Sequence, residues 1–85
     1  MHPSRFQESE WWVSRSGVAE ERCLVIAGRA KLTLPGGEEL RIRGGDWVVF
    51  KKGFTCTWEV EEDICKYYSY YRQDGSLWEA PLDSQ

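Results

Sequence analysis

The residues of this 85-residue chain that could act as nucleophiles or soft metal ligands are three cysteines and one histidine. Cys23, Cys56 and Cys65 are separated by 33 and 9 residues, a spacing that fits neither a disulfide framework nor a paired-cysteine zinc or redox motif. The single histidine, His2, stands next to Met1, which disfavours a triad or a metal centre built on histidines. We therefore expect reduced thiols in a cytoplasmic compartment, acting mainly as small buried hydrophobic residues.

Aromatic side chains are the second group with binding chemistry, with five Trp, four Tyr and three Phe. Rings in strands pack in a core or a subunit interface more often than they hold a ligand, but rings at a barrel mouth also stack on planar or sugar-like molecules. Tyr67 and Tyr68, followed by Tyr70 and Tyr71, place rings on both faces of one strand. A second copy of the chain would cover one of these faces, so we expect a homodimer.

Short segments of alternating apolar and polar residues must position these side chains. Strands are predicted at residues 22–27, 31–34, 39–43, 47–50, 54–61 and 64–72, separated by Gly, Pro or acidic residues. The alternation is cleanest in 54–61, whereas 47–50 is apolar on both faces and therefore predicts a central strand. No segment has a helical period. The pattern predicts an all-β barrel or sandwich.

Length and charge limit the organisation and the partners. Residues 1–15 are predicted to form an N-terminal arm or edge strand, 16–72 a single barrel, and 73–85 a tail that packs on the barrel or on a partner. The net charge of −3, with both signs mixed along the chain, disfavours nucleic acid as a partner. No apolar run is long enough to cross a membrane, so no membrane partner is expected.

Two stretches resemble the motifs of small single-domain cupins, specifically the cupin domain of (S)-ureidoglycine aminohydrolase. Glu21, followed by six residues and Gly28, resembles the first motif. The stretch 45–58 begins Gly-Asp, continues as an apolar strand, turns at Lys-Lys-Gly and carries Cys56, which resembles the second. The motifs and the hairpin between them span residues 21–68. The resemblance implies a small antiparallel jelly-roll barrel.

The same resemblance implies a metal site that this sequence does not complete. Metal-binding cupins place histidines at positions that correspond here to Arg15, Gly17 and Cys56, so only Glu21 and Cys56 stand at ligand positions. We therefore expect no bound metal ion. If a metal ion did bind, Glu21 and Cys56 would be its ligands. The sequence does not indicate any other cofactor. The family's manganese-assisted release of ammonia from ureidoglycine is therefore not expected to transfer. A thiol facing a carboxylate should have a raised pKa, which argues against a cysteine nucleophile.

The resemblance and the strand alternation together predict a pocket inside the barrel. Glu21 would act there as a protonated acid or hydrogen-bond donor, or as a carboxylate satisfied by its neighbours. We expect a small-molecule-binding cupin whose catalytic residues, if any, are unassigned. Two alternatives stay open: a metal-dependent enzyme of ureide or amide metabolism, and an interaction module of OB type. The expected pocket residues are Glu21, Cys23, Cys56, Trp58, Trp47 and Tyr67.

Overall fold

The computed structural model describes residues 1–17, 19–72 and 74–78, and these residues form seven strands and no helix. All strand pairings are antiparallel, which confirms the predicted all-β class. No helix in the described ranges is long and apolar enough to cross a membrane. The strands are β1 (His2–Phe6), β2 (Trp11–Arg15), β3 (Glu20–Thr33), β4 (Glu39–Arg43), β5 (Trp47–Phe50), β6 (Thr55–Tyr71) and β7 (Leu77–Trp78).

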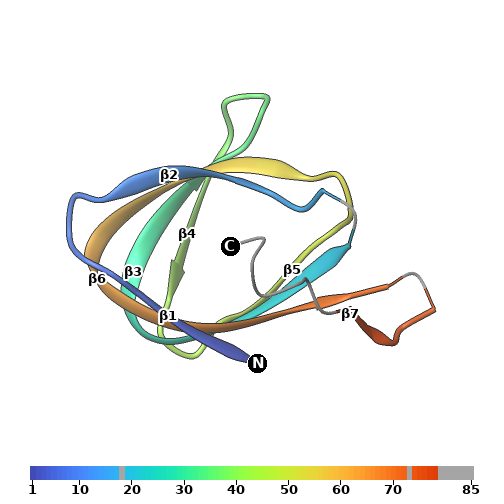
Figure 1. The fold of residues 1–85 in the computed structure, drawn as a ribbon. Helices are drawn as coiled ribbons and strands as arrows, with labels where there is room; N and C mark the ends of the chain where they lie inside the picture. Colours follow the sequence, from blue (N-terminus) through green and yellow to red (C-terminus); the bar gives the residue numbers. More distant parts are fainter. Residues whose placement is uncertain (18, 73, 79–85) are drawn as a thin grey trace.

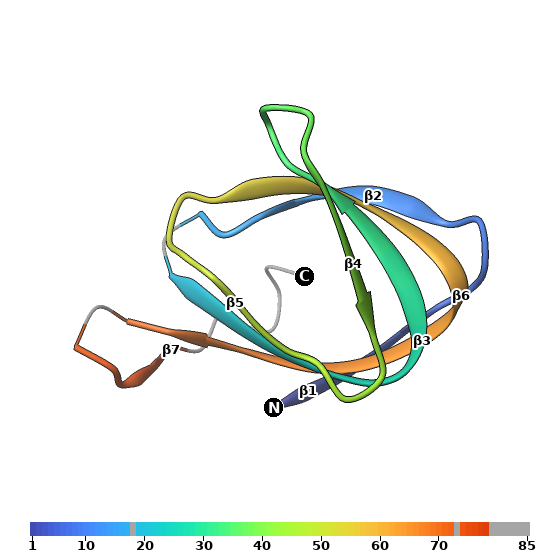
Figure 2. The same ribbon diagram turned by 180° about the vertical axis from the view of Figure 1, so that it is seen from behind.

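Two long strands, β3 and β6, hold the barrel together by pairing with each other along their whole length. The first half of β3 and the second half of β6 form one layer, together with β1 and β5, and β7 pairs with the end of β6. The second half of β3 and the first half of β6 form the other layer with β2 and β4. Figures 1 and 2 show both long strands curving from one layer into the other.

The bend lies at Gly28, where the sequence predicted that a strand would end. The chain instead continues through the glycine as one strand, because Gly28 takes a positive φ of 91° and the pairing shifts register between Val25 and Ala30. The expected break at Glu62 and Asp63 is likewise wrong, since β6 is continuous there. Each predicted pair of short strands is one bent strand.

A second correction concerns the segment predicted to be a central strand. Strand β5 pairs only with β3 among the described residues, so it is an edge strand. Its two apolar faces have different neighbours: Phe50 is buried in the core, whereas Trp47 is 53% exposed on the outer surface. In the tail, Leu77 and Trp78 extend the first layer as β7, and Leu82 lies outside the described residues.

The core lies between the two layers and consists of the inward residues of the alternating strands. Trp58 and Cys23 are fully buried, and Phe6 and Trp12 pack against this cluster from β1 and β2. Burial of each large apolar side chain contributes about 1.5–3 kcal/mol. The buried core residues are Cys23, Val25, Ala30, Leu32, Ile42, Phe50, Cys56, Trp58, Val60 and Ile64.

Candidate functional site

A buried pair of opposite charges lies inside the barrel. Glu21 on β3 and Lys66 on β6 both point inward, and their side chains are 5% and 7% exposed. The Lys66 Nζ atom lies 3.8 Å from Glu21 Oε2, so the two groups attract each other without a hydrogen bond. Charged groups buried to this degree are uncommon unless they are paired. The pair is the most polar feature of an otherwise apolar interior.

Four aromatic rings surround the ammonium group of Lys66. Its Nζ atom lies 4.3 Å from the centroid of a Trp58 ring and 5.6 to 6.0 Å from the rings of Tyr68, Trp12 and Phe6. The rings also contact one another, since Phe6 stacks on Trp12 at 4.1 Å and Trp12 stacks on Trp58 at 5.2 Å. Their negative faces stabilise the cation in place of water. We call these four residues the aromatic cage.

Burial changes the acidity of the groups near the pair. It raises the pKa of Glu21, and the positive charge of Lys66 opposes this increase only in part. Burial raises the pKa of Cys23 to about 11 and that of Tyr70 to about 12. The pKa of Cys56 is also raised, by burial and then by the negative charge of Glu21. Both interior thiols are therefore protonated at neutral pH and are poor nucleophiles.

An indole donor in the same region is left without a partner. The Nε1 atom of Trp58 is buried and makes no hydrogen bond of acceptable geometry with any described residue. It lies close enough to the Cys56 thiol to lower the pKa of that thiol slightly, against the larger effect of burial. An unused buried donor costs free energy, so this N–H is available to an acceptor that reaches it.

The structure brings four of the six predicted pocket residues together. Glu21 and Cys23 on β3 face Cys56 and Trp58 on β6 across the barrel, and all four are buried. Trp47 and Tyr67, also expected in the pocket, lie on the outside. Strand alternation explains the error, because both pair with Leu24, which faces away from the interior that Glu21 and Cys23 occupy.

Lys66 is the buried charged residue of this candidate site that the sequence analysis missed. Its position could have been found, because it lies between Ile64 and Tyr68 in the alternation of the last strand and therefore faces inward. A lysine on the inward face of a strand is unusual enough to mark a candidate site. We interpreted this strand by its four tyrosine rings and did not consider the charge of the neighbouring lysine.

The residues at the cupin metal positions do not fit a metal ion. Arg15 and Gly17 are exposed, and the described residues contain no group of three His, Cys, Asp or Glu placed to hold a metal. The Lys66 ammonium already supplies a positive charge beside Glu21, where it would repel a cation. Burial and the negative charge of Glu21 raise the pKa of Cys56, which opposes the thiolate form that zinc requires.

An apolar cavity of about 190 Å³ lies between the edges of the two layers. Leu40 and Ile42 of β4 line one side, Val48 and Phe50 of β5 line the other, and Cys56 belongs to its wall. Lys51 is the only charged residue in the lining as far as the structure describes the chain. Cys56 thus connects this cavity to Glu21 and Lys66, whose charges act on its thiol. We call it the apolar pocket.

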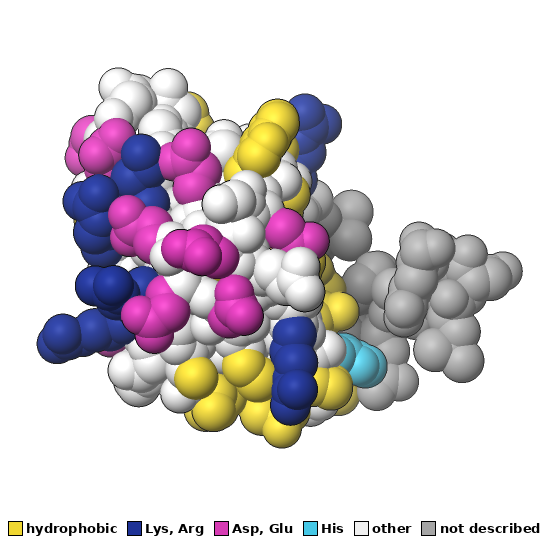
Figure 3. All heavy atoms as spheres, turned by 90° about the vertical axis from the view of Figure 1, so that its left-hand side faces the viewer, with side chains coloured by type: hydrophobic (Ala, Val, Ile, Leu, Met, Phe, Trp, Pro, Cys, Tyr) yellow, Lys and Arg dark blue, Asp and Glu magenta, His cyan; other side chains and the backbone are white. Residues whose placement is uncertain are grey.

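The outer surfaces of the two layers differ in character. On the second layer, Lys31 bonds Glu59 at 2.9 Å and Arg41 contacts Glu61 at 3.3 Å. Figure 3 shows cationic and acidic side chains side by side on one face of the molecule, with hydrophobic side chains gathered along the lower edge of the view. On the first layer, Trp47, Leu24, Tyr67 and Pro3 are in register across β5, β3, β6 and β1.

Comparison with solved structures shows the same fold in several proteins. A DUF861 family protein of Thermotoga maritima is 27% identical, with a TM-score of 0.73 over 82% of this chain and 77% of that one. A putative ethanolamine utilization protein Q of Salmonella typhimurium has a TM-score of 0.69 at 15% identity, over 80% of this chain and 53% of that one. The Clostridium difficile EutQ protein has a TM-score of 0.70 at 18% identity, over 85% and 55%.

The chain spans about half the length of these two EutQ structures. Because the sequence identities are below 25%, the structural similarity supports a shared fold and no shared activity. No curated protein matches the chain. The family model of the EutQ-like cupin domain matches residues 7–68, which include both motifs and the buried pair. The chain therefore belongs to the EutQ-like cupin domain family.

Proposed function

We propose that this cupin domain binds a small, largely apolar molecule in the apolar pocket, without a metal held by histidines. The pocket is the observation that carries the proposal. An apolar cavity of about 150 Å³ lined by Leu, Ile and Phe is known to take up benzene, so about 190 Å³ accommodates a slightly larger molecule. Ligand sites of this type are mostly apolar with few polar groups.

Lys51 determines the expected chemical class of the ligand. Its side chain is exposed and is the single charged group among the described residues at the pocket, so it would pair with one negative charge on a bound molecule. The remaining lining residues offer only apolar contact and the protonated thiol of Cys56. An aromatic or branched aliphatic monocarboxylate combines these two requirements.

The test uses benzoate as the probe and two matched variants. Leu40 is 54% exposed on β4 at the pocket, and Val13 is 48% exposed on β2, the other edge of the same layer. We expect the wild type and Val13→Arg to bind benzoate with saturable changes in the NMR spectrum, and Leu40→Arg to bind at least about tenfold more weakly because its side chain fills the pocket.

Two results would contradict this proposal. One is a wild-type chain whose spectrum does not change with benzoate up to millimolar concentrations. The other is Leu40→Arg binding as well as Val13→Arg, which would place the probe elsewhere on the molecule. Thermal unfolding of both variants serves as the control for folding, since exposed substitutions on edge strands should change stability little.

We also propose that the outer face of the first layer binds a second copy of the chain. Trp47, Leu24, Tyr67 and Pro3 form an apolar row in register across four strands, which supports this expectation. Trp47 and Tyr67 are 53% and 39% exposed, which is costly for aromatic side chains in water. An uncharged row is complementary to itself about a two-fold axis, and sheets readily pack face to face.

A further inference from the structure

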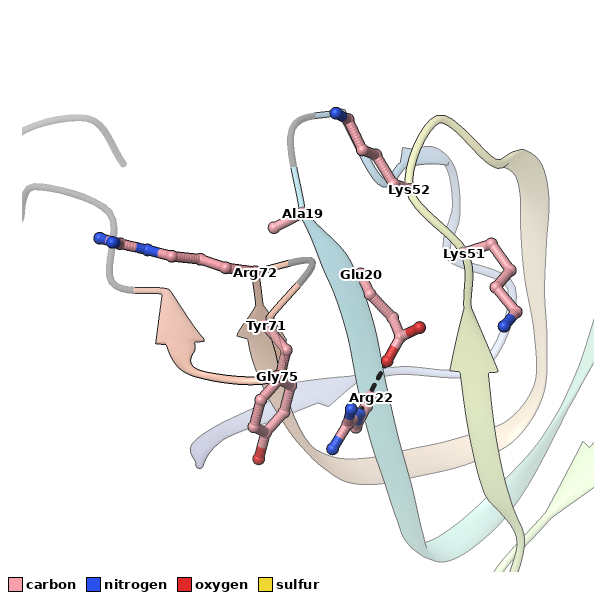
Figure 4. A pocket seen from close by; sticks show the side chains of 8 residues that line it. All are labelled: Ala19, Glu20, Arg22, Lys51, Lys52, Tyr71, Arg72 and Gly75. Atoms are coloured by element: carbon pink, nitrogen blue, oxygen red, sulfur yellow. Dashed lines mark hydrogen bonds and ion pairs between the residues drawn. The ribbon is translucent and has the colours of Figure 1, made fainter.

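We infer a second binding site, for small anions of the phosphate class that carry two or more charges, on the outside of the barrel. It is a cavity of about 320 Å³ where the first residues of β3 and the last residues of β6 meet the loop after β5. In Figure 4, Lys51 and Lys52 lie on one side of Glu20 and Arg22, and Tyr71 and Arg72 lie on the other. The site adjoins the apolar pocket, with which it shares Lys51, and goes beyond the proposed function.

The charge of this cavity is opposite to that of the chain. Among the described residues, its lining includes four cationic side chains, Arg22, Lys51, Lys52 and Arg72, and one carboxylate, that of Glu20. These described lining residues carry a net charge of +3, whereas the whole chain carries −3. A concave surface of one sign concentrates the opposite ion, which raises both the local concentration and the association rate of an anion.

One of the four cations is held in a fixed position. The Arg22 Nε atom bonds Glu20 Oε2 at 2.8 Å, and its guanidinium carbon lies 3.9 Å from the centroid of the Tyr71 ring. These two contacts neutralise Glu20 and restrain the guanidinium, so little entropy is lost when its remaining N–H groups bind an anion.

The other three cations form no salt bridge with a described residue, namely Lys51, Lys52 and Arg72. Hydrogen bonds from Ser76 lower the pKa of Asp74, and Arg72 nevertheless lies close enough to lower the pKa of that carboxyl group further. A second arginine-lined cavity has a smaller net charge of +1 over its described lining, which is Arg29, Arg41 and Arg43 with Asp46 and Glu61. The first cavity therefore has the larger excess of positive charge.

Size and donor chemistry narrow the ligand to the phosphate class. A volume of about 320 Å³ is at the lower end of small-molecule sites, which favours a compact ligand. Guanidinium and ammonium groups together bind phosphate oxygens strongly, and the cations on both sides of Glu20 suit an anion of two or more charges. Inorganic pyrophosphate combines small size with high charge and is therefore the probe.

The experiment titrates inorganic pyrophosphate into the isotope-labelled full chain at low ionic strength, followed by NMR. We expect saturable shifts of the backbone amides of Arg22, Lys52 and Gly75. The double variant Lys52→Gln/Arg72→Gln should bind about tenfold or more weakly, since each unit charge at about 4 Å is worth roughly fivefold even in water. Lys51 stays unchanged because it also lines the apolar pocket.

The control variant is Arg41→Gln/Arg43→Gln, which removes the same charge from the other cavity. It should change the affinity for pyrophosphate less than twofold. Equal weakening by both double variants would mean non-specific attraction and would overturn the inference, as would a wild type without saturable binding. Leu40→Arg should bind pyrophosphate like the wild type, so failure at the apolar pocket and failure at this site are distinguishable.

Discussion

At the scale of single residues, Glu21 and Lys66 lose nearly all contact with water and gain a charge partner at 3.8 Å without a hydrogen bond. The aromatic cage replaces part of the hydration of Lys66, whereas the pKa of Glu21 is raised because its burial outweighs the attraction of Lys66. Such a pair adds little net stability compared with apolar residues, but removal of one partner leaves an uncompensated buried charge.

We predict that Lys66→Met destabilises the fold by about 3 kcal/mol at pH 7, and by less near pH 4.5. Without Lys66 the pKa of Glu21 rises further, so the folded state holds its proton more tightly than the unfolded chain does. Stability then decreases as the pH rises above 4.5, the ordinary pKa of the group. Urea unfolding at both pH values measures this difference.

The double variant Glu21→Gln/Lys66→Met is the control for this prediction. It removes both charges from the interior, so most of the lost stability should return and the pH dependence should disappear. A double variant that is as unstable as Lys66→Met at pH 7 would show that the lost cation–ring contacts, and not the unpaired carboxyl group, cause the loss of stability.

At the scale of elements, the bend in β3 and β6 allows two long strands to serve both layers. At this bend a Cβ atom on Gly28 would lie 2.1 Å from the main-chain oxygen of Asp63 on β6. The close approach of the two backbones therefore requires a glycine, in addition to the positive φ that favours one. The bend directs Glu21 and Lys66 toward the interior from one layer and Cys56 and Trp58 from the other.

We predict that Gly28→Ala destabilises the fold by about 3 kcal/mol or more, because the backbones of β3 and β6 must separate. Gly37 is a matched control: it has the same φ of 91°, but a Cβ atom there would meet nothing within 4 Å. Gly37→Ala should cost only about 1 kcal/mol, the conformational part. Equal losses in denaturant unfolding would show that the contact with Asp63 is unimportant.

At the scale of the whole molecule, a network of paired surface charges and the apolar row lie on different layers. The second layer pairs its surface charges, as with Lys31 and Glu59, and such a face is stable in water. The first layer presents the apolar row that begins at Trp47 and ends at Pro3. The proposed dimer buries this row and leaves the charged face in solvent.

We predict that the chain sediments as a dimer at micromolar concentration and that Trp47→Glu converts it to a monomer, because a charge would be buried in the interface. Trp11 is 68% exposed on β2 of the other layer, so Trp11→Glu is the matched control and should stay dimeric. A wild type that sediments as a monomer of about 9.9 kDa would contradict the proposal.

The amino-acid sequence by itself determined the strand class, most inward positions and the incomplete metal motif. Period-two alternation in 54–61 depends only on neighbouring residues, so Cys56 and Trp58 could be assigned to one face without coordinates. The same rule gave Glu21 and Cys23 a common face. The absence of histidines at the metal positions could also be seen in the sequence, because identifying a residue type does not require coordinates.

Only the tertiary structure decided which faces meet across the barrel and which stay outside. Trp47 and Tyr67 looked like pocket residues until their pairing with Leu24 placed them outward, and pairing joins segments far apart in the chain. Besides Tyr68, the groups around Lys66 come from β1, β2, β3 and the first half of β6, so the alternation within its own strand does not reveal them. Long-range packing, and not local preference, creates the buried charge pair and both cavities.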